Sequence, residues 1–437
     1  MSNKKNQIVI IGGGAAGIAL ARWLGGRFGR RHNIILVDRN RTHVWKPLLH
    51  EIATGALDAN LDEVSYQSHG HRWGYRFFFG AMEDIDRQAR EVIIAPLLDE
   101  DGTELIARQA ISYDYLVIAT GSVTNDFGTP GVQEHCLFLD DRIQADRFRS
   151  RLLNHCLRVS RAMNGDTSTD RYVRIAIVGG GATGVELAAE LYNSASALHD
   201  YGLEVFDESR LEVTLIEAGP RILPALPERL ARAAHCELQD LGVRVLTGTP
   251  VVEATHDAIV TGSGERIGCD LKVWAAGVKG AAFLDRIGGL ESNHTSQLVV
   301  RPTLQTTRDN RIFAIGDSSS CLLPGNQRPA PPRAQVAHQM AKTAYRNLDR
   351  MMAGKELMPF IYRDHGSLVS LSRFSTVGSL MGNLIGGRMA IEGRLARFIY
   401  LSLYRMHLIA IHGWLKGAAL ILLGHVNRIT RPRIKLH

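Results

Sequence analysis

Two glycine-rich stretches of nearly the same sequence could bind phosphate groups in this 437-residue chain. IVIIGGGAAGIAL begins at Ile8 and IAIVGGGATGVEL begins at Ile175, and eight of the thirteen aligned residues are identical. The glycines of the G-x-G-x-x-G pattern are Gly12, Gly14 and Gly17 in the first copy and Gly179, Gly181 and Gly184 in the second. In each copy a β-branched run precedes the glycines and a helical pattern follows, so amides at a helix N-terminus would meet a pyrophosphate. The two copies predict two dinucleotide sites.

An acidic residue ends the second strand that we expect in each half of the chain. NIILVD ends at Asp38, and LEVTLIE ends at Glu217. A carboxylate at this point can bind the ribose 2′-hydroxyl and repels a 2′-phosphate. The spacing from Gly184 to Glu217 is longer than usual, which we interpret as an insertion of YGLEVFDESR.

Two further segments indicate electron transfer. YDYLVIATGS (Tyr113–Ser122) and TTRDNRIFAIGD (Thr306–Asp317) are apolar strands that end in glycine turns. Both resemble the additional FAD signatures of two-dinucleotide flavoproteins, in which the aspartate of the Gly-Asp pair binds a ribityl hydroxyl. Asp317 alone would be interpreted as a helix N-cap before Ser318, but beside the other signatures the FAD role is favoured. We therefore expect one tightly bound FAD and one nicotinamide coenzyme that comes and goes.

These segments predict an α/β fold with two Rossmann-like dinucleotide-binding domains, one inserted into the other. The FAD-binding domain would consist of residues 1–125 and 286–385. The NADH-binding domain would span 165–285, with a connector at 126–164. Residues 386–437 would form amphipathic helices that bind a membrane.

With these segments placed, the sequence closely resembles the bacterial type II NADH dehydrogenases. These are single-subunit NADH:quinone oxidoreductases that carry FAD and do not pump protons. The resemblance covers essentially the whole chain. Its most specific blocks are HVWKPLLHEIATGALD (His43–Asp58), GSVTNDFGTPGV (Gly121–Val132), RILPALPERL (Arg221–Leu230), PPRAQVAHQMA (Pro331–Ala341) and DHGSLVSLSRFSTVGSLMG (Asp364–Gly382).

The resemblance implies which residues bind each cofactor. The implied FAD residues are Gly12, Gly14, Ala15, Ala16, Gly17, Asp38, Arg39, Lys46, Ala81, Gly121, Asp317, Gln335 and Val336. The implied NADH residues are Gly179, Gly181, Thr183, Gly184, Glu186, Glu217 and Gly277. Among them, Asp38 would bind the adenosine ribose of FAD, Lys46 would approach the isoalloxazine ring, and Glu217 would favour NADH over NADPH.

Glu186 stands where the first copy of the repeat has Ala19. The resemblance implies a catalytic glutamate here, pointing toward the junction of nicotinamide and flavin. Two alternatives stay open. Glu186 could be a glutamate near a helix N-terminus that is stabilised by the helix dipole, or Glu190, one turn later, could take the catalytic place.

Gln335 and Gln339 are four residues apart, so they share one face of a helix. The resemblance implies that both lie beside the flavin, where a quinone carbonyl would dock. Neutral amides suit this task because they stabilise charge on a reduced quinone without holding the product as tightly as a cation would. His338 is interpreted as a partly exposed helical histidine in preference to a proton donor.

The implied reaction passes a hydride from NADH to N5 of FAD and then two electrons to a membrane quinone. The cofactor supplies this chemistry, and the protein orients the reactants. Two other functions stay open: a sulfide:quinone-type reductase, and a membrane-tethered FAD- and NADH-binding redox sensor with slow turnover. The Gln335/Gln339 pair argues against the sensor. The five cysteines argue against the reductase and for a reducing compartment, because they lie far apart without a CxxC pair.

The positive charge of the protein is concentrated at its C-terminus. Residues 394–437 contain eight Lys or Arg and no acid, so the net charge of +7 leaves about −1 for the remaining residues. This distribution makes a nucleic-acid partner improbable. The histidines, acids and cysteines do not cluster at metal-ligand spacing, so no metal site is expected.

The segment Arg394–Lys416 has the pattern of an amphipathic helix. One sector carries cations and the opposite face is apolar, as in helices that lie at the surface of an anionic phospholipid bilayer. The alternative is a helix packed on the body of the protein or on a dimer partner, and a homodimer is a further possibility. The chain has no apolar run of about 18 residues, so no transmembrane helix is expected. The pattern predicts a peripheral protein on the cytoplasmic face of the cell membrane.

Overall fold

The chain divides into two compact units, each made of segments that are distant in sequence. The computed structural model describes residues 5–58, 60, 63–165, 172–198, 208–323, 325, 328–364, 366–371, 375–382, 387–392, 408–414 and 416–419. Unit 1 comprises Met1–Trp45, Asp62–Val123 and Val278–Asp364. Unit 2 comprises Lys46–Leu61, Thr124–Gly277 and His365–His437.

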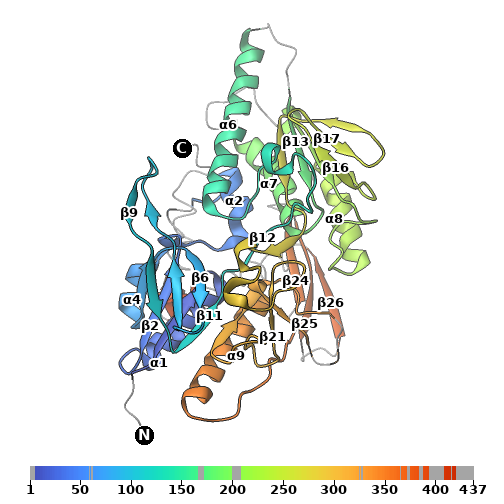
Figure 1. Cartoon of the computed structure of the whole chain (residues 1–437). Coiled ribbons are helices and arrows are strands. Elements are labelled where there is room, and N and C mark those ends of the chain that lie inside the picture. Colours follow the sequence, from blue (N-terminus) through green and yellow to red (C-terminus); the bar gives the residue numbers. More distant parts are fainter. Residues whose placement is uncertain are drawn as a thin grey trace. The chain divides into compact units, whose positions relative to one another are not determined.

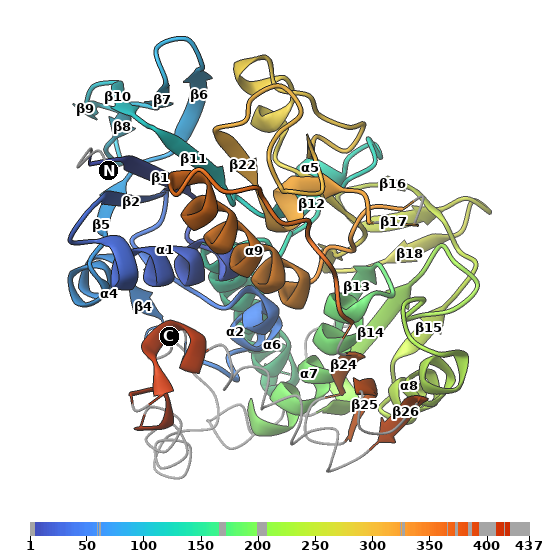
Figure 2. The ribbon, with the colours of Figure 1, turned by 90° about the horizontal axis from the view of Figure 1, so that it is seen from below.

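A parallel five-stranded sheet forms the centre of unit 1 (Figures 1 and 2). Its order is β22-β11-β1-β2-β5, made by Ile312–Ala314, Tyr115–Ile118, Gln7–Ile11, Asn33–Asp38 and Arg76–Phe79. The β1 residues Ile8 to Ile11 are almost completely buried, as expected for a central strand covered on both faces. Helices α1 (Ala15–Phe28) and α9 (Ala334–Met352) pack against each other beside this sheet (Figure 2).

A second parallel sheet, of four strands, forms the centre of unit 2. Its order is β15-β14-β13-β19, made by Arg244–Leu246, Leu211–Ile216, Val173–Val178 and Leu271–Trp274. The main helices of the unit are α2 (Leu49–Thr54), α6 (Arg142–Gly165), α7 (Ala182–Leu198) and α8 (Glu228–Asp240). The short helix α2 packs against both α6 and α7 (Figure 2).

The two units repeat one plan. In each, a glycine loop follows the first strand, and the second strand pairs in parallel with the first. An antiparallel three-stranded sheet then precedes the strand that pairs with the other edge of the first strand. These inserted sheets are β6 (Met82–Asp86), β7 (Glu91–Ile94) and β10 (Gln109–Ser112) in unit 1, and β16 (Val251–Ala254), β17 (Ala258–Thr261) and β18 (Arg266–Gly268) in unit 2. The expected α/β fold with two Rossmann-like domains is confirmed. The exact domain boundaries and the connector stay predictions.

Shorter elements join these layers. They are β3 (Thr42–His43), η1 (Lys46–Leu48), β4 (Val64–Ser65), α4 (Tyr66–Trp73), β8 (Leu97–Leu98), β9 (Glu104–Ile106), β12 (Ser122–Thr124), α5 (Val132–His135), η3 (Glu208–Arg210), β20 (Val278–Gly280), η4 (Ala282–Leu284), η5 (Ile287–Gly289), β21 (Leu298–Val300), η6 (Gly316–Ser318) and β23 (Ser319–Cys321). The segment interpreted as an insertion lies mostly outside the described residues, which resume at Glu208.

The C-terminal part of unit 2 contains an antiparallel sheet of β24 (Gly366–Leu371), β25 (Ser375–Gly382) and β26 (Gly387–Glu392). Of the amphipathic helix expected over Arg394–Lys416, residues 394–407 and 415 lie outside the described part of the chain. Residues 408–412 are helical, and Gly413 then adopts a left-handed φ of +81°, which interrupts the helix. Among the described residues, no helix is both long and apolar enough to cross a membrane.

A buried asparagine fixes the end of unit 1 to α9. Asn347 is completely buried, and its amide nitrogen donates to the carbonyls of Thr303, at 3.0 Å, and Met358, at 2.8 Å. Its amide oxygen accepts from the Met358 backbone N–H at 2.9 Å. Two of these hydrogen bonds therefore hold the chain that follows α9 on the helix, and the third joins the helix to the segment at Thr303.

We expect Asn347→Ala to lower the free energy of unfolding by about 2–4 kcal/mol, because it leaves buried backbone groups without partners. Chemical unfolding followed by circular dichroism measures this change. The exposed Asn154 of α6 provides a control, and Asn154→Ala should alter stability by less than about 0.5 kcal/mol. Equal effects of the two substitutions would contradict the assigned role.

Candidate functional site

The three glycines of the first loop meet three different steric demands. Gly12 has a left-handed φ of +98°, and a Cβ atom there would lie 2.4 Å from the carbonyl oxygen of Ala119. At Gly17 a Cβ atom would lie 1.8 Å from the carbonyl oxygen of Gly12, so only glycine lets α1 pack this close to the turn. At Gly14 a Cβ atom would have no protein atom within 4 Å. Gly14 therefore leaves an open approach to the backbone at the start of α1, as pyrophosphate binding requires.

The second loop repeats this geometry in unit 2. Gly179 has a φ of +115°, with a Cβ atom 2.7 Å from backbone atoms of Ala275 and Ala276. At Gly184 a Cβ atom would lie 2.0 Å from the Gly179 carbonyl oxygen, while Gly181 again has no atom within 4 Å. Both loops thus fit a dinucleotide pyrophosphate on steric grounds alone.

The carboxylates at the strand ends hold the loops. In unit 1, Asp38 Oδ2 accepts from the Gly13 backbone N–H at 2.6 Å, and its Oδ1 accepts from the backbone N–H of Asn40 at 2.7 Å. In unit 2, Glu217 Oε2 accepts from the Gly180 backbone N–H at 2.7 Å. Burial raises the pKa of Asp38, and these hydrogen bonds oppose that rise. Each carboxylate has acceptor capacity beyond the loop amide, which suits the expected contact with a ribose hydroxyl.

Two side chains that the sequence analysis did not single out contact the backbone of the first loop. The Tyr66 hydroxyl donates to the Gly13 carbonyl at 2.8 Å, and His43 Nδ1 lies 2.9 Å from the same oxygen. Both side chains are buried, and burial raises the pKa of Tyr66 well above its usual value. His43 opens the HVWKPLLHEIATGALD block, which was a usable signal, whereas Tyr66 follows the block without a recognisable pattern.

The Gly-Asp pair lies at the start of α9, as the expected FAD role requires. Gly316 has a φ of +69°, and a Cβ atom there would lie 3.3 Å from Ala337 and 3.9 Å from Ala16 at the start of α1. Asp317 Oδ2 accepts from the Ser122 hydroxyl at 2.9 Å. Unit 1 therefore brings together the first glycine loop, the TGS turn after β11, the Gly-Asp pair and the start of α9.

The two glutamines of α9 have different surroundings. Gln339 donates from its amide nitrogen to the Arg363 carbonyl at 2.8 Å and accepts from the Arg363 N–H at 3.0 Å, so it engages the backbone on both sides of its amide. Gln335 donates to Asp364 Oδ1 at 3.2 Å. His338 faces the Trp23 ring edge-on at 5.2 Å between centroids, and burial lowers its pKa. This packing fits a histidine held in the protein body.

Glu186 is buried within unit 2, and a histidine lies beside it. Its carboxylate Oε2 is 3.6 Å from Nδ1 of His50 in α2, and both side chains are less than a tenth exposed. Glu190, the alternative candidate, is equally buried and accepts from the Asn193 amide at 2.6 Å. The sequence analysis did not single out His50, although it lies in the quoted block.

Lys46 begins η1 in unit 2, and its Nζ lies 3.2 Å from Asp140 Oδ1. Asp140 also accepts from the backbone N–H and the hydroxyl of Thr124, each at 3.0 Å. Asp140 thus joins Lys46 to the GSVTNDFG segment. About half of the Lys46 side chain is exposed, so the amino group is accessible to a ligand.

The other expected residues occupy varied environments. Ala16 and Val336 are buried, Ala15 and Gly121 are half-buried, and Arg39, Ala81, Thr183 and Gly277 are exposed. Gly277 has a φ of +65°, and a Cβ atom there would lie 2.4 Å from the exposed ring of Phe127. In unit 2 the AAG turn that ends at Gly277 corresponds to the ATG turn that ends at Gly121 in unit 1.

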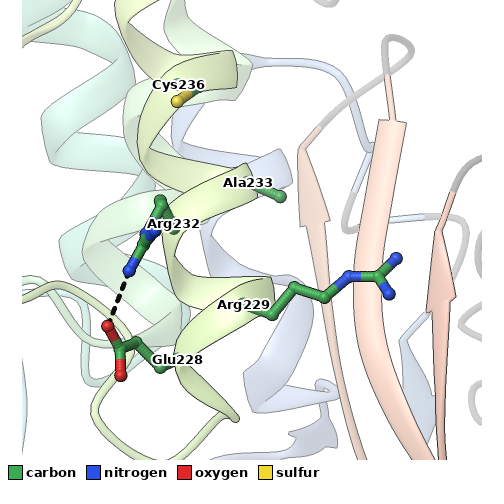
Figure 3. Close-up of a pocket in the computed structure, with 5 residues that line it drawn as sticks. All are labelled: Glu228, Arg229, Arg232, Ala233 and Cys236. Atoms are coloured by element: carbon green, nitrogen blue, oxygen red, sulfur yellow. Dashed lines mark hydrogen bonds and ion pairs between the residues drawn. The ribbon is translucent and has the colours of Figure 1, made fainter.

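A shallow pocket on α8 contains none of the expected residues (Figure 3). Glu228, Arg229, Arg232, Ala233 and Cys236 line it, and Arg232 pairs with Glu228 at 2.7 Å. We assign it no part in the chemistry. Among the described residues, no group of three or more His, Cys, Asp or Glu side chains could hold a metal ion.

Comparisons with known proteins agree with this geometry. A model of the pyridine nucleotide-disulphide oxidoreductase family matches residues 6–341. A type II NADH:quinone oxidoreductase from Haemophilus influenzae is 47% identical over 443 residues, which cover 98% of this chain and 99% of that protein. A solved structure of NDH2 from Plasmodium falciparum in complex with NADH is similar with a TM-score of 0.82 at 18% identity, covering 99% of this chain and 100% of that one.

A sulfide:quinone oxidoreductase from Aquifex aeolicus is also similar in fold, with a TM-score of 0.70 at 17% identity. The match covers 97% of this chain and 95% of that one. At these identities the two structural likenesses concern the fold alone.

Because Gly14 and Gly181 occupy open positions in different loops, we expect a substitution at each to weaken the binding of a different ligand. Gly14→Ala should fold normally but retain little FAD, because a methyl group would enter the approach to the first loop. Gly181→Ala should retain FAD and bind NADH at least about tenfold more weakly, about 1.4 kcal/mol. Visible absorbance measures bound FAD, and titration with NADH measures the second affinity.

Gly268→Ala is the matched control, because a Cβ atom at Gly268 also meets no protein atom within 4 Å but lies outside both loops. It should leave both ligands unaffected. Normal FAD content in Gly14→Ala would show that the first loop is not the FAD site.

Proposed function

Because the chain belongs to the pyridine nucleotide-disulphide oxidoreductase family, and within it to the type II NADH:quinone oxidoreductases, we propose that it oxidises NADH and reduces a quinone. The family expected from the sequence is thereby confirmed. Bound FAD would supply the redox chemistry, taking a hydride from NADH and passing two electrons to the quinone, which would also take up two protons. The observation that carries the proposal is the presence of two complete glycine loops, each held by its own carboxylate, in two units of one chain.

The residues of unit 1 would hold FAD. Gly12, Gly14 and Gly17 shape the backbone that would receive the pyrophosphate, and Asp38 supports that backbone while it keeps acceptor capacity for the adenosine ribose. Asp317 would bind a ribityl hydroxyl. The Ser122 hydroxyl, which donates to Asp317, would orient its carboxylate for that contact.

The residues of unit 2 would bind NADH. Gly179, Gly181 and Gly184 repeat the open backbone of the first loop, and the Glu217 carboxylate would repel the 2′-phosphate of NADPH. Glu186 would face the nicotinamide from α7. Lys46, half-exposed beside Asp140, would approach the flavin ring.

Gln335 is the better supported of the two glutamines for contact with a quinone. Its amide nitrogen donates to a side chain, that of Asp364, at 3.2 Å, and a ligand can displace a side chain more easily than backbone. Gln339 holds the Arg363 backbone through both ends of its amide, so it would act mainly by fixing the segment that faces Gln335.

A sulfide:quinone-type reaction has less support. Such chemistry needs nucleophilic thiolates. Four of the cysteines are buried, and burial raises the pKa of Cys136 and Cys156 to about 12 and that of Cys269 and Cys321 to about 11. Cys236 is exposed on α8, in the pocket of Figure 3.

A direct experiment separates the enzyme from a slow redox sensor. Purified yellow protein should bleach when NADH is added, and a ubiquinone analogue should restore the colour within seconds. Rapid-mixing absorbance spectroscopy follows both steps. Bleaching without recovery on addition of quinone would favour the sensor, and protein that NADH does not bleach would refute the proposal.

Glu217→Gln should relax the preference for NADH over NADPH by about tenfold, because it removes the negative charge beside the 2′ position while it keeps an acceptor oxygen for the loop. The ratio of kcat/KM values for the two coenzymes measures the preference. Glu212→Gln is a matched control, since Glu212 lies on β14, which ends just before Glu217, and its exposed side chain pairs with Arg174. A ratio unchanged in Glu217→Gln would remove its assigned role.

For the C-terminal region we propose contact with an anionic phospholipid surface on the cytoplasmic face of the membrane. One support is that residues 394–437 contain eight Lys or Arg and no acid. Another is that Trp414 is 76% exposed and that the exposed Lys416 follows it. Indole rings and cations of this kind gather at bilayer interfaces. A homodimer through this region stays a prediction from the family resemblance.

The full-length protein should sediment with phosphatidylglycerol vesicles and much less with phosphatidylcholine vesicles, and high salt should weaken the binding. Trp414→Ala should reduce the bound fraction. Leu98→Ala, which truncates another exposed apolar side chain, should not. Equal binding to both kinds of vesicle would contradict the electrostatic part of this proposal.

A further inference from the structure

The short helix α2 (Leu49–Thr54) is buried over most of its length and carries one imidazole. The His50 side chain is 3% exposed, and Leu49, Ile52 and Ala53 around it are buried apolar residues. Because α2 packs against α7 within unit 2, His50 reaches Glu186, and its Nδ1 lies 3.6 Å from Glu186 Oε2. The glycine loop itself does not need the contact between His50 and Glu186.

A buried histidine beside a buried carboxylate is costly for stability. Each polar side chain loses its hydration, which costs about 1–3 kcal/mol unless a partner replaces the water. Well-packed apolar residues of similar volume often stabilise a protein equally well or better. Packing alone therefore does not account for this pair.

The contact is not a simple ion pair. Burial lowers the pKa of His50 to about 4, so its ring is neutral near pH 7. The ring also forms a hydrogen bond with the Pro47 carbonyl in the preceding turn, which opposes this fall in pKa. His50 is thus tied to its own backbone and also lies within 3.6 Å of the Glu186 carboxyl. This arrangement limits the positions that the carboxyl can adopt.

We propose that His50 is a positioning residue for NADH oxidation, which holds the Glu186 carboxyl in its working orientation at the end of the second glycine loop. The inference rests on the proposed function. Glu186 is the fifth residue of α7, so it lies about 6 Å along the helix axis from the first residue, close behind the loop. At that distance a small displacement of the carboxyl would alter how the nicotinamide is oriented and leave the pyrophosphate contacts unchanged.

The test is a double-mutant cycle on the rate of NADH-driven flavin bleaching in the FAD-loaded protein. We expect His50→Leu to slow bleaching about tenfold, with the NADH dissociation constant unchanged within about twofold. In the Glu186→Gln background the same substitution should slow bleaching less than about twofold, because His50 acts through the carboxyl that is no longer there. His50→Gln, which keeps a polar side chain, should recover part of the rate.

His69→Leu is the matched control. His69 is also a buried histidine on a short helix, but it contacts the Tyr75 hydroxyl in unit 1, so its loss should not change the bleaching rate of the loaded protein. If His50→Leu does not retain FAD, His50→Gln replaces it in the double-mutant cycle.

Equal slowing in both backgrounds, or no slowing by any His50 variant, would overturn the inference. Wild-type protein that NADH cannot bleach would refute the proposed function instead, so the two failures are distinguishable. A raised NADH dissociation constant with an unchanged bleaching rate would place His50 in coenzyme binding and would also overturn the positioning role.

Discussion

The hydrogen bond between a carboxylate at the end of the second strand and the amide after the first glycine fixes each dinucleotide loop. It measures 2.6 Å between Gly13 N and Asp38 Oδ2, and 2.7 Å between Gly180 N and Glu217 Oε2. Since the two strands are parallel neighbours, the carboxylate necessarily lies at the edge of the sheet where the loop turns. One side chain therefore holds the turn, and its negative charge would disfavour a phosphate on a ribose bound beside it.

The two loops differ in the groups that contact the carbonyl of the residue after the first glycine. In unit 1 the Gly13 carbonyl accepts from the Tyr66 hydroxyl and lies 2.9 Å from the His43 ring. In unit 2 the Gly180 carbonyl accepts from the backbone N–H of Leu223, at 2.7 Å. Buried side chains fix the first loop, whereas the second is joined to the backbone of Leu223, a buried residue with a left-handed φ of +49°.

The sequence was sufficient to predict whatever depends on local pattern. Glycine spacing, β-branched runs and terminal acids predicted both loops, the strands around them and the α/β class, because these features obey steric rules that act within about 40 residues. It could not place Tyr66 on the Gly13 carbonyl or His50 on Glu186. Those contacts depend on how separate segments pack, and a lone tyrosine or histidine carries no periodic signal. The different surroundings of Gln335 and Gln339 were hidden for the same reason, since a shared helix face does not specify what lies opposite.

Helix α7 carries a row of buried polar side chains that packing alone does not explain. Glu186, Glu190 and Asn193 are spaced at i, i+4 and i+7, so they share one face of the helix, and each is 7% exposed. A helix of this kind would be more stable with apolar residues on that face. The first copy of the repeat has the apolar Ala19 at the position of Glu186. The glycine loops of the two copies shape the backbone in the same way. In the second copy, the glutamate in place of alanine puts a carboxyl directly behind the loop, where the coenzyme would react. The stability lost along this face of α7 supports the proposal that Glu186 has a role beyond packing.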